Sequence, residues 1–175
     1  MHSKFSSFIA KRPTIILGSA SKSRRAIMDE LATLYKFSYT VKTADFDEKA
    51  IRHDDPQTLV LALGRAKAAA IIARHPGEPG FLITCDQVVV HQGRILEKPE
   101  SPQQCREFIH GYSIAPASTV GSIVCTDLQT GKTVSMVDVC HIHFSPIPPS
   151  VVEELIEGEL QRKSGFMPGS NATYK

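Results

Sequence analysis

Residues 81–90, FLITCDQVVV, constrain the fold more than any other stretch of this chain. The run is almost continuously apolar, which is typical of a strand that a sheet buries on both faces. Strand-like and helix-like segments alternate around it in the order βαβαββαββα. This order predicts a mixed, twisted sheet with flanking helices, an α/β domain at the border of the α+β class.

Residues 15–35 are predicted to form a strand, a tight turn and a helix. The apolar start, IIL, gives way to small and hydroxyl residues in GSAS, and AIMDELATLY (26–35) follows. Ile27, Leu31 and Leu34 fall at positions i, i+4 and i+7, so they mark the expected buried face of an amphipathic helix.

Three cations, Lys22, Arg24 and Arg25, fall in the first turn of that helix. The helix dipole is positive there, so each exposed cation costs about 0.3–1 kcal/mol. An anion bound at the turn would reverse the effect, because the free backbone N–H groups, the dipole and the arginines would all point at it. The alternative is three solvated cations on a surface turn.

Capping and turn signals place the remaining elements. Residues 37–41 alternate as a strand does, and the turn HQGR (91–94) reverses the central strand. Asp55 and Pro56 begin a helix whose expected apolar face is Leu59, Ala62, Leu63, Ala66, Ala70 and Ala73. The later elements are a helix capped by Ser101 and closed by Gly111, a hairpin of strands 119–128 and 133–144, and a helix with a capping box of Ser150 and Glu153 that Gly158 can end.

Composition is that of one ordinary globular domain. The chain has 175 residues, 42% of them hydrophobic, and a net charge of +2, which indicates neither a nucleic-acid groove nor a polybasic membrane patch. We expect an N-terminal extension at 1–13, the domain at 14–160 and an irregular tail at 161–175. Four cysteines without a CxxC pair, and no segment of membrane-spanning length, favour a reduced, cytoplasmic protein.

Asp86 is the strongest candidate for chemistry, because an unpaired carboxylate in an apolar strand would be costly to bury. It must be paired, bound to a metal or placed at the mouth of the strand, where ligand crevices form in open α/β sheets. The structural alternative is an Asp that caps a neighbouring backbone. Asp45, Asp47 and Glu48 follow a strand and could supply oxygen ligands to Mg²⁺, although a solvated acidic loop is the favoured interpretation for at least two of them.

Lysines and histidines give weaker signals. Lys67 lies one position off the expected apolar helix face and Lys98 ends a short strand, so each alone is typical of a surface lysine. His141 and His143 share one strand face and Cys140 lies on the other, which disfavours a zinc site. The chain has no Walker loop, nucleophile elbow or dinucleotide fingerprint.

Seven segments in order resemble the Maf family, the septum-formation-inhibitor-like nucleoside triphosphate pyrophosphatases. They are GSASKSRR, DFDEKAI, LALGRAKAAA, TCDQVVV, ILEKPES, CREFIHGYS and VCHIHFSPIPPSVVEELIEGE. The resemblance implies a fold like that of the inosine-triphosphate pyrophosphatases, with two lobes around a cleft. It also implies hydrolysis of a nucleotide to its monophosphate and pyrophosphate. From the charge balance we expect no nucleic-acid or membrane partner, and a homodimer stays open.

The resemblance also implies roles for particular residues. It makes Asp86 and Lys98 catalytic and places a divalent metal, Mg²⁺ with Mn²⁺ or other ions as alternatives, at Glu48 and Asp86. The substrate-binding residues it implies are Ser19, Ser21, Ser23, Arg24, Arg25, Lys67 and Gln87. On this reading the cations at the helix start face a triphosphate.

The chain departs from the family pattern in two ways. Ser23 stands at the first Arg of the motif SxSPRR, and Gln87 at the Thr of a DT pair, which is similar to the branch associated with 7-methyl-GTP rather than dTTP or UTP. Family members also continue beyond the last segment matched here, so a truncated chain is expected. This second departure motivates an alternative function, a catalytically inactive nucleotide-binding or regulatory module.

Overall fold

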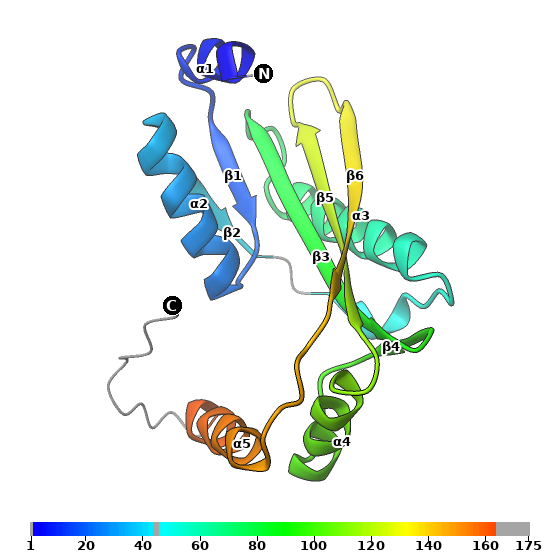
Figure 1. Ribbon diagram of the computed structural model, residues 1–175. Helices are drawn as coiled ribbons and strands as arrows, with labels where there is room; N and C mark the ends of the chain where they lie inside the picture. The colour runs from blue at the N-terminus through cyan, green and yellow to red at the C-terminus, as the bar shows by residue number, and fades with distance from the viewer. Residues whose placement is uncertain (1, 44–45, 164–175) are drawn as a thin grey trace. The chain divides into compact units, whose positions relative to one another are not determined.

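A computed structural model describes residues 2–43 and 46–163 of the chain (Figure 1). The chain divides into two compact units. The first, unit 1, comprises Met1–Val88 and Thr119–Cys140, and the second, unit 2, comprises Val89–Ser118 and His141–Lys175.

The elements follow the predicted alternation, preceded by one additional helix. In chain order they are α1 (His2–Ile9), β1 (Ile15–Gly18), α2 (Lys22–Tyr35), β2 (Thr40–Lys42), the short 3-10 helix η1 (Glu48–Ala50), α3 (Pro56–Arg74), β3 (Phe81–His91), β4 (Arg94–Leu96), α4 (Pro102–Tyr112), β5 (Ala117–Asp127), β6 (Thr133–Ile142) and α5 (Pro149–Lys163). Among the residues described, six strands form one sheet in the order β2-β1-β3-β5-β6, with β4 paired to β3. Strand β1 is parallel to β2 and β3, and β4 is antiparallel to β3, so the predicted mixed α/β sheet is confirmed.

Strand β1 lies between β2 and β3, and this order places two helices on opposite faces of the sheet. The chain leaves β1 through α2 to reach β2, then passes through α3 to reach β3 on the other side of β1. Right-handed crossovers in opposite directions put α2 on one face and α3 on the other (Figure 1). Ligands bind at such a point in open α/β sheets, beside the carboxyl ends of the two strands.

The core of unit 1 reflects this arrangement. Ile15 and Leu17 of β1 pack with Ile9 of α1 and Met28 of α2, whereas the intervening Ile16 packs with Ala68 and Ile71 of α3 and with Leu82 of β3. Successive side chains of a strand point to opposite faces, so β1 contributes to both clusters. The segment expected to be an N-terminal extension therefore packs on the core through α1.

The predicted buried face of α2 is wrong. Ile27, Leu31 and Leu34 are 57%, 38% and 69% exposed, and Met28 is the buried residue of this helix. A helical repeat of apolar residues identifies a stripe, but the position of the helix on the sheet decides whether that stripe is covered. Here Met28, next to the stripe, points at β1.

Helix α3 begins as predicted, with Asp55 accepting a hydrogen bond from the Thr58 N–H and Pro56 in the first turn. Its buried face is rotated from the predicted one. Leu59 and Leu63 are buried as expected, but Ala73 is exposed. The other buried positions are Val60, Gly64, Ala68 and Ile71. This rotation brings Lys67 toward the sheet.

Three further predictions need correction. Strand β2 covers Thr40–Lys42 rather than residues 37–41. Helix α5 starts at Pro149, so Ser150 lies inside it and makes no capping box; the carbonyl of Pro148 instead accepts from the N–H groups of Val151 and Val152. The same helix continues through Gly158 to Lys163, so the prediction that this glycine ends the helix is wrong; a single glycine lowers helix propensity without excluding a helix. The rest of the predicted tail, residues 164–175, lies outside the described residues.

In unit 2, the predicted helix after Ser101 is confirmed as α4, which packs on α5. The Arg106 guanidinium binds both carboxylate oxygens of Glu153 at 2.6 and 2.7 Å, which links the two helices. Across the ranges 2–43 and 46–163, none of the helices combines the length and hydropathy needed to cross a bilayer.

Candidate active site

Asp86 lies on the face of β3 that points toward α3, together with Leu82 and Thr84, and all three are buried. The ammonium of Lys67 donates to Asp86 Oδ1 at 2.5 Å. Of these two side chains, only 10% of Asp86 and 12% of Lys67 is exposed. Asp86 is therefore paired, which is one of the three situations expected for a carboxylate in this strand, and Lys67 is not a solvated surface lysine.

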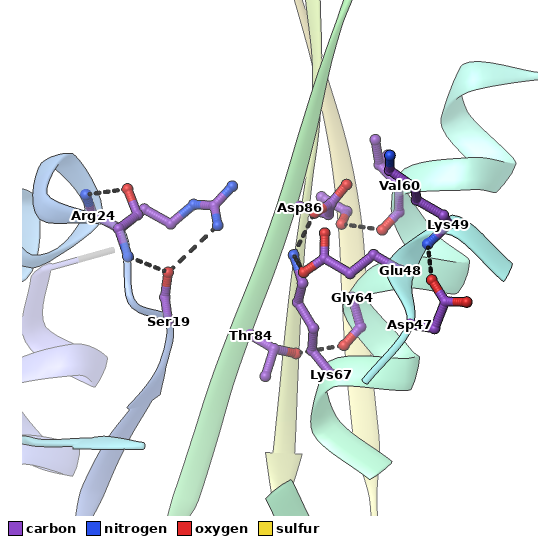
Figure 2. Close-up of polar contacts among 12 residues, drawn as sticks. Ser19, Arg24, Asp47, Glu48, Lys49, Val60, Gly64, Lys67, Thr84 and Asp86 are labelled. Atoms are coloured by element: carbon purple, nitrogen blue, oxygen red, sulfur yellow. Dashed lines mark hydrogen bonds and ion pairs between the residues drawn. The ribbon is translucent and has the colours of Figure 1, made fainter. Parts of the chain in front are cut away.

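Glu48 completes this acidic and basic group. Its Oε1 lies 3.3 Å from Lys67 Nζ, and its side chain is about half exposed. Figure 2 shows Glu48 and Asp86 converging on the same ammonium from η1 and β3. Asp47 fixes η1, because its Oδ1 accepts a hydrogen bond from the Lys49 N–H at 3.0 Å. Asp47 is thus a helix cap, and Asp45 lies outside the described residues.

A second group forms at the start of α2. Ser19 directly follows β1 and is buried; its Oγ accepts from Arg24 Nη1 at 3.4 Å and from the Ser21 N–H at 3.2 Å. Ser21 caps α2 by accepting from the Arg24 N–H, and its hydroxyl lies 3.0 Å from that of Ser23. The first turn carries no acidic residue, so hydroxyls, a guanidinium and the helix N-terminus offer donors to an anion.

The two groups flank the same part of β3. Gly18, just before Ser19, pairs with Thr84, two residues before Asp86. Cys85 lies between Thr84 and Asp86 in β3. Burial raises the pKa of its thiol, whereas the positive charges of Arg24 and Lys67 both act to lower that pKa. In Figure 2 the Ser19–Arg24 pair lies on one side of β3 and the Lys67, Asp86 and Glu48 group on the other. The structure thus places a set of anion donors and a pair of carboxylates on either side of the same part of β3.

Other residues singled out in the sequence take no part in the contacts described above. Lys22 and Arg25 are exposed on α2, and the backbone carbonyl of Arg25 accepts from the Tyr39 hydroxyl at 3.3 Å. Gln87 is exposed on the face of β3 opposite Asp86. Lys98 is exposed after β4 in unit 2. The roles of these four residues stay predictions.

The CHIH segment makes a different contact. His141 Nδ1 lies 2.7 Å from the hydroxyl of Ser118, and Cys140 is exposed. Within the described part of the chain, no three His, Cys, Asp or Glu side chains are grouped closely enough to hold a metal ion by themselves. Two carboxylates suffice where Mg²⁺ keeps waters and also binds substrate phosphates.

Sequence reasoning missed two hydroxyls beside the site. Thr84 and Ser122 are buried on β3 and β5 and donate to backbone carbonyls of α3. The available signal was the alternation of β3, which puts Thr84 on the same face as Asp86. Nothing in the sequence identified Ser122.

Comparisons with known proteins show which family this chain is similar to. The model of the family described as Maf-like protein matches residues 14–167. A 7-methyl-GTP pyrophosphatase from Dictyostelium discoideum is 38% identical over 164 residues, which cover 90% of this chain and 81% of that protein. A nucleoside triphosphate pyrophosphatase from Chlamydia muridarum is 28% identical, with 87% and 76% covered. Among solved structures, a nucleoside-triphosphatase / dITP/XTP pyrophosphatase from Mycobacterium abscessus is 12% identical with a TM-score of 0.47, covering 86% of this chain and 94% of that one.

Proposed function

This chain belongs to the Maf-like protein family, and we propose that it hydrolyses nucleoside triphosphates between the α- and β-phosphates, releasing a nucleoside monophosphate and pyrophosphate. The observation that carries the proposal is the pairing of two groups across β3: anion donors at Ser19 and Arg24, and the carboxylates of Asp86 and Glu48 joined by Lys67. Relatives named as a 7-methyl-GTP pyrophosphatase and a nucleoside triphosphate pyrophosphatase support the same reaction.

The triphosphate binds at the start of α2 in this proposal. Free N–H groups and the helix dipole favour an anion there, and the Arg24 guanidinium, already held by Ser19, adds a charge-assisted hydrogen bond. Binding of the phosphates would offset the cost of clustering Lys22, Arg24 and Arg25 in one helical turn.

A divalent cation fits the other side of β3. Glu48 Oε1 and Asp86 Oδ1 converge on one ammonium at 3.3 and 2.5 Å, so these two oxygens can approach a single positive centre. Oxygen donors of this kind suit Mg²⁺, with Mn²⁺ as a substitute. When bound, the metal would neutralise phosphate oxygens and lower the pKa of the attacking water.

Asp86 is the proposed general base. Its carboxylate takes the proton of the attacking water; the water oxygen bonds to phosphorus, and one P–O bond of the α–β bridge breaks as pyrophosphate leaves. Lys67, which contacts both carboxylates, lies where its ammonium can offset the charge developing on the phosphates. A catalytic role for Lys98 rests on the resemblance of its segment, ILEKPES, to the family pattern and stays a prediction.

For the nucleobase of the substrate, we propose that 7-methyl-GTP is preferred over dTTP and UTP. Two observations support this choice: the relative that is 38% identical is named as a 7-methyl-GTP pyrophosphatase, and Gln87 directly follows Asp86 on an exposed position of β3. Removal of a modified nucleotide from the triphosphate pool would then be the role of the reaction.

A panel of nucleotides tests the proposed reaction and the proposed nucleobase preference together. Purified protein is incubated with Mg²⁺ or Mn²⁺ and each of 7-methyl-GTP, GTP, dTTP and UTP, and the products are separated by ion exchange. We expect monophosphate and pyrophosphate, with the highest kcat/KM for 7-methyl-GTP and no turnover in EDTA. Release of a diphosphate and inorganic phosphate would refute cleavage at the α–β bond, and binding without turnover would favour the inactive nucleotide-binding module instead.

A further inference from the structure

Two strands of unit 1 each direct a buried hydroxyl at the same helix. Thr84 Oγ1 on β3 donates to the carbonyl of Gly64 at 2.7 Å, and Ser122 Oγ on β5 donates to the carbonyl of Val60 at 2.6 Å. Both side chains are almost completely buried, at 0% and 2% exposed. The two carbonyls are four residues apart, so they lie on one side of α3, one turn from each other.

These two hydrogen bonds determine the rotation of α3 and its position along its axis, which apolar packing does not determine. Burial of apolar surface is non-directional, so it holds α3 on the sheet without determining its rotation or its position along its axis. A hydrogen bond has a defined distance and angle, and two of them one turn apart determine both quantities. The carbonyls can accept them because each oxygen has a second lone pair beside its intrahelical bond.

The backbone of α3 lies directly on the strands at this point. A Cβ added to Gly64 would lie 2.9 Å from Val124 Cγ2 and 3.1 Å from Ser122 Oγ. Gly64 therefore permits the close approach on which the two hydrogen bonds depend. A side chain at this position would force Val124 or Ser122 to shift.

The contact between Lys67 and Asp86 joins the same helix and strand, α3 and β3, as the hydrogen bond from Thr84 to Gly64. Asp86 follows Thr84 by two residues on the same face of β3, and Lys67 follows Gly64 by three residues on α3. Figure 2 shows the Thr84–Gly64 contact below the Lys67–Asp86 contact, with both running between β3 and α3. A rotation of α3 by one residue is about 100° and would turn Lys67 away from the sheet.

We propose that Thr84 and Ser122 are positioning residues for the proposed hydrolysis: their hydroxyls hold α3 in the register in which Lys67 reaches Asp86 and Glu48. This inference rests on the proposed function for its effect on turnover, but the placement of Lys67 can be measured without turnover. Neither hydroxyl contacts substrate or metal; both act through the backbone of α3.

Thr84→Val removes the hydroxyl and keeps the shape of the side chain. We expect kcat to fall on the order of tenfold, because small misplacements of catalytic groups are costly, while KM stays close to that of the parent. Thr84→Ser retains the hydroxyl and should restore kcat. If Thr84 acts through Lys67, Thr84→Val should cause no additional loss in a Lys67→Met background.

Thr126→Val is the matched control. Thr126 is also a buried hydroxyl, 5% exposed, on β5, but its partner is the Thr133 hydroxyl rather than α3. This change should leave kcat unaltered. Ser122→Ala serves as the second test variant, so the inference stays falsifiable if Thr84→Val fails to fold.

Acetylation of lysines under native conditions, mapped by mass spectrometry, reads the position of Lys67 directly. Lys67 should be modified several-fold faster in Thr84→Val and Ser122→Ala than in the parent, Thr84→Ser and Thr126→Val. Lys42, which pairs with Glu78 at 2.7 Å in the same unit, is the internal control and should not change. Equal labelling of Lys67 with unchanged kcat in both test variants would overturn the inference. A parent without pyrophosphatase activity would reject the proposed function, and the labelling would still decide the placement of Lys67.

Discussion

Helices α2 and α3 each connect two parallel strands of one sheet, but they are attached to it in different ways. Helix α3 buries Leu59, Val60, Leu63, Gly64, Ala68 and Ile71, and two strand hydroxyls bind its carbonyls. Helix α2 buries Met28 alone and leaves its apolar stripe exposed.

This difference in burial between α2 and α3 corresponds to the proposed roles of the residues that each helix supplies. Lys67 on α3 must meet two carboxylates, and catalysis depends on such geometry at the level of about 1 Å. The donors at the start of α2 need only attract a flexible, highly charged phosphate chain, and charge attraction falls slowly with distance. We therefore divide the proposed site into a rigid half with the proposed catalytic groups (Lys67, Asp86 and Glu48), called the catalytic half, and a less constrained half with the proposed phosphate donors (Ser19, Ser21 and Arg24), called the binding half.

The largest effect is expected from Asp86→Asn in the catalytic half. The change removes the proposed base and one metal charge but keeps the shape and hydrogen-bonding capacity of the side chain, so kcat should fall by about 10²–10⁴-fold. Circular dichroism should show a retained cooperative thermal transition. Loss of that transition together with activity would make Asp86 a structural residue.

A matched pair of Leu→Ala changes measures the attachment of the two helices. Leu63 on α3 is 6% exposed, so its truncation should lower the free energy of unfolding by about 2–5 kcal/mol. Leu34 on α2 is far more exposed, so Leu34→Ala should stay within about 0.5 kcal/mol of the parent. Urea titration gives both values, and similar losses for the two variants would contradict the contrast between α2 and α3.

Arg24→Ala should separate binding from catalysis. Loss of one charge-assisted contact to the phosphates is worth about 1.4 kcal/mol, so KM for the triphosphate should rise about tenfold with kcat nearly unchanged. Inhibition by the monophosphate product should weaken less. An equal weakening for monophosphate and triphosphate would remove Arg24 from the phosphate tail.

The smallest effect concerns Cys85, which lies on β3 between the two halves. Burial raises the pKa of its thiol, so less thiolate is present at pH 8 and alkylation should be slower than at the exposed Cys140. A bound non-hydrolysable triphosphate should slow Cys85 further and leave Cys140 unchanged. If saturating ligand does not change the rate at which Cys85 is alkylated, the phosphates bind elsewhere.

The sequence predicted those features that depend on local chemistry. Asp55 and Ser101 begin helices because a side-chain oxygen followed by Pro is a signal read within one turn. Asp86 could be identified because a carboxylate in an apolar strand requires a partner. The partner itself, Lys67, looked like a surface lysine in the sequence.

Features that depend on tertiary contact could not be predicted in the same way. The stripe of Ile27, Leu31 and Leu34 has helical spacing whether or not a sheet covers it. The rotation of α3 follows from Thr84 and Ser122, which lie far from Gly64 and Val60 in the sequence. A helical wheel drawn for α3 alone therefore misses both the rotation and the inward position of Lys67.

Calorimetric titration of a non-hydrolysable triphosphate into Asp86→Asn and Arg24→Ala tests the division of the site most directly. Both titrations are run in EDTA, so that loss of a metal charge does not enter the comparison. The division predicts that Asp86→Asn binds within about threefold of the parent, whereas Arg24→Ala binds about tenfold more weakly. Equal losses of affinity in the two variants, or a larger loss in Asp86→Asn, would contradict it.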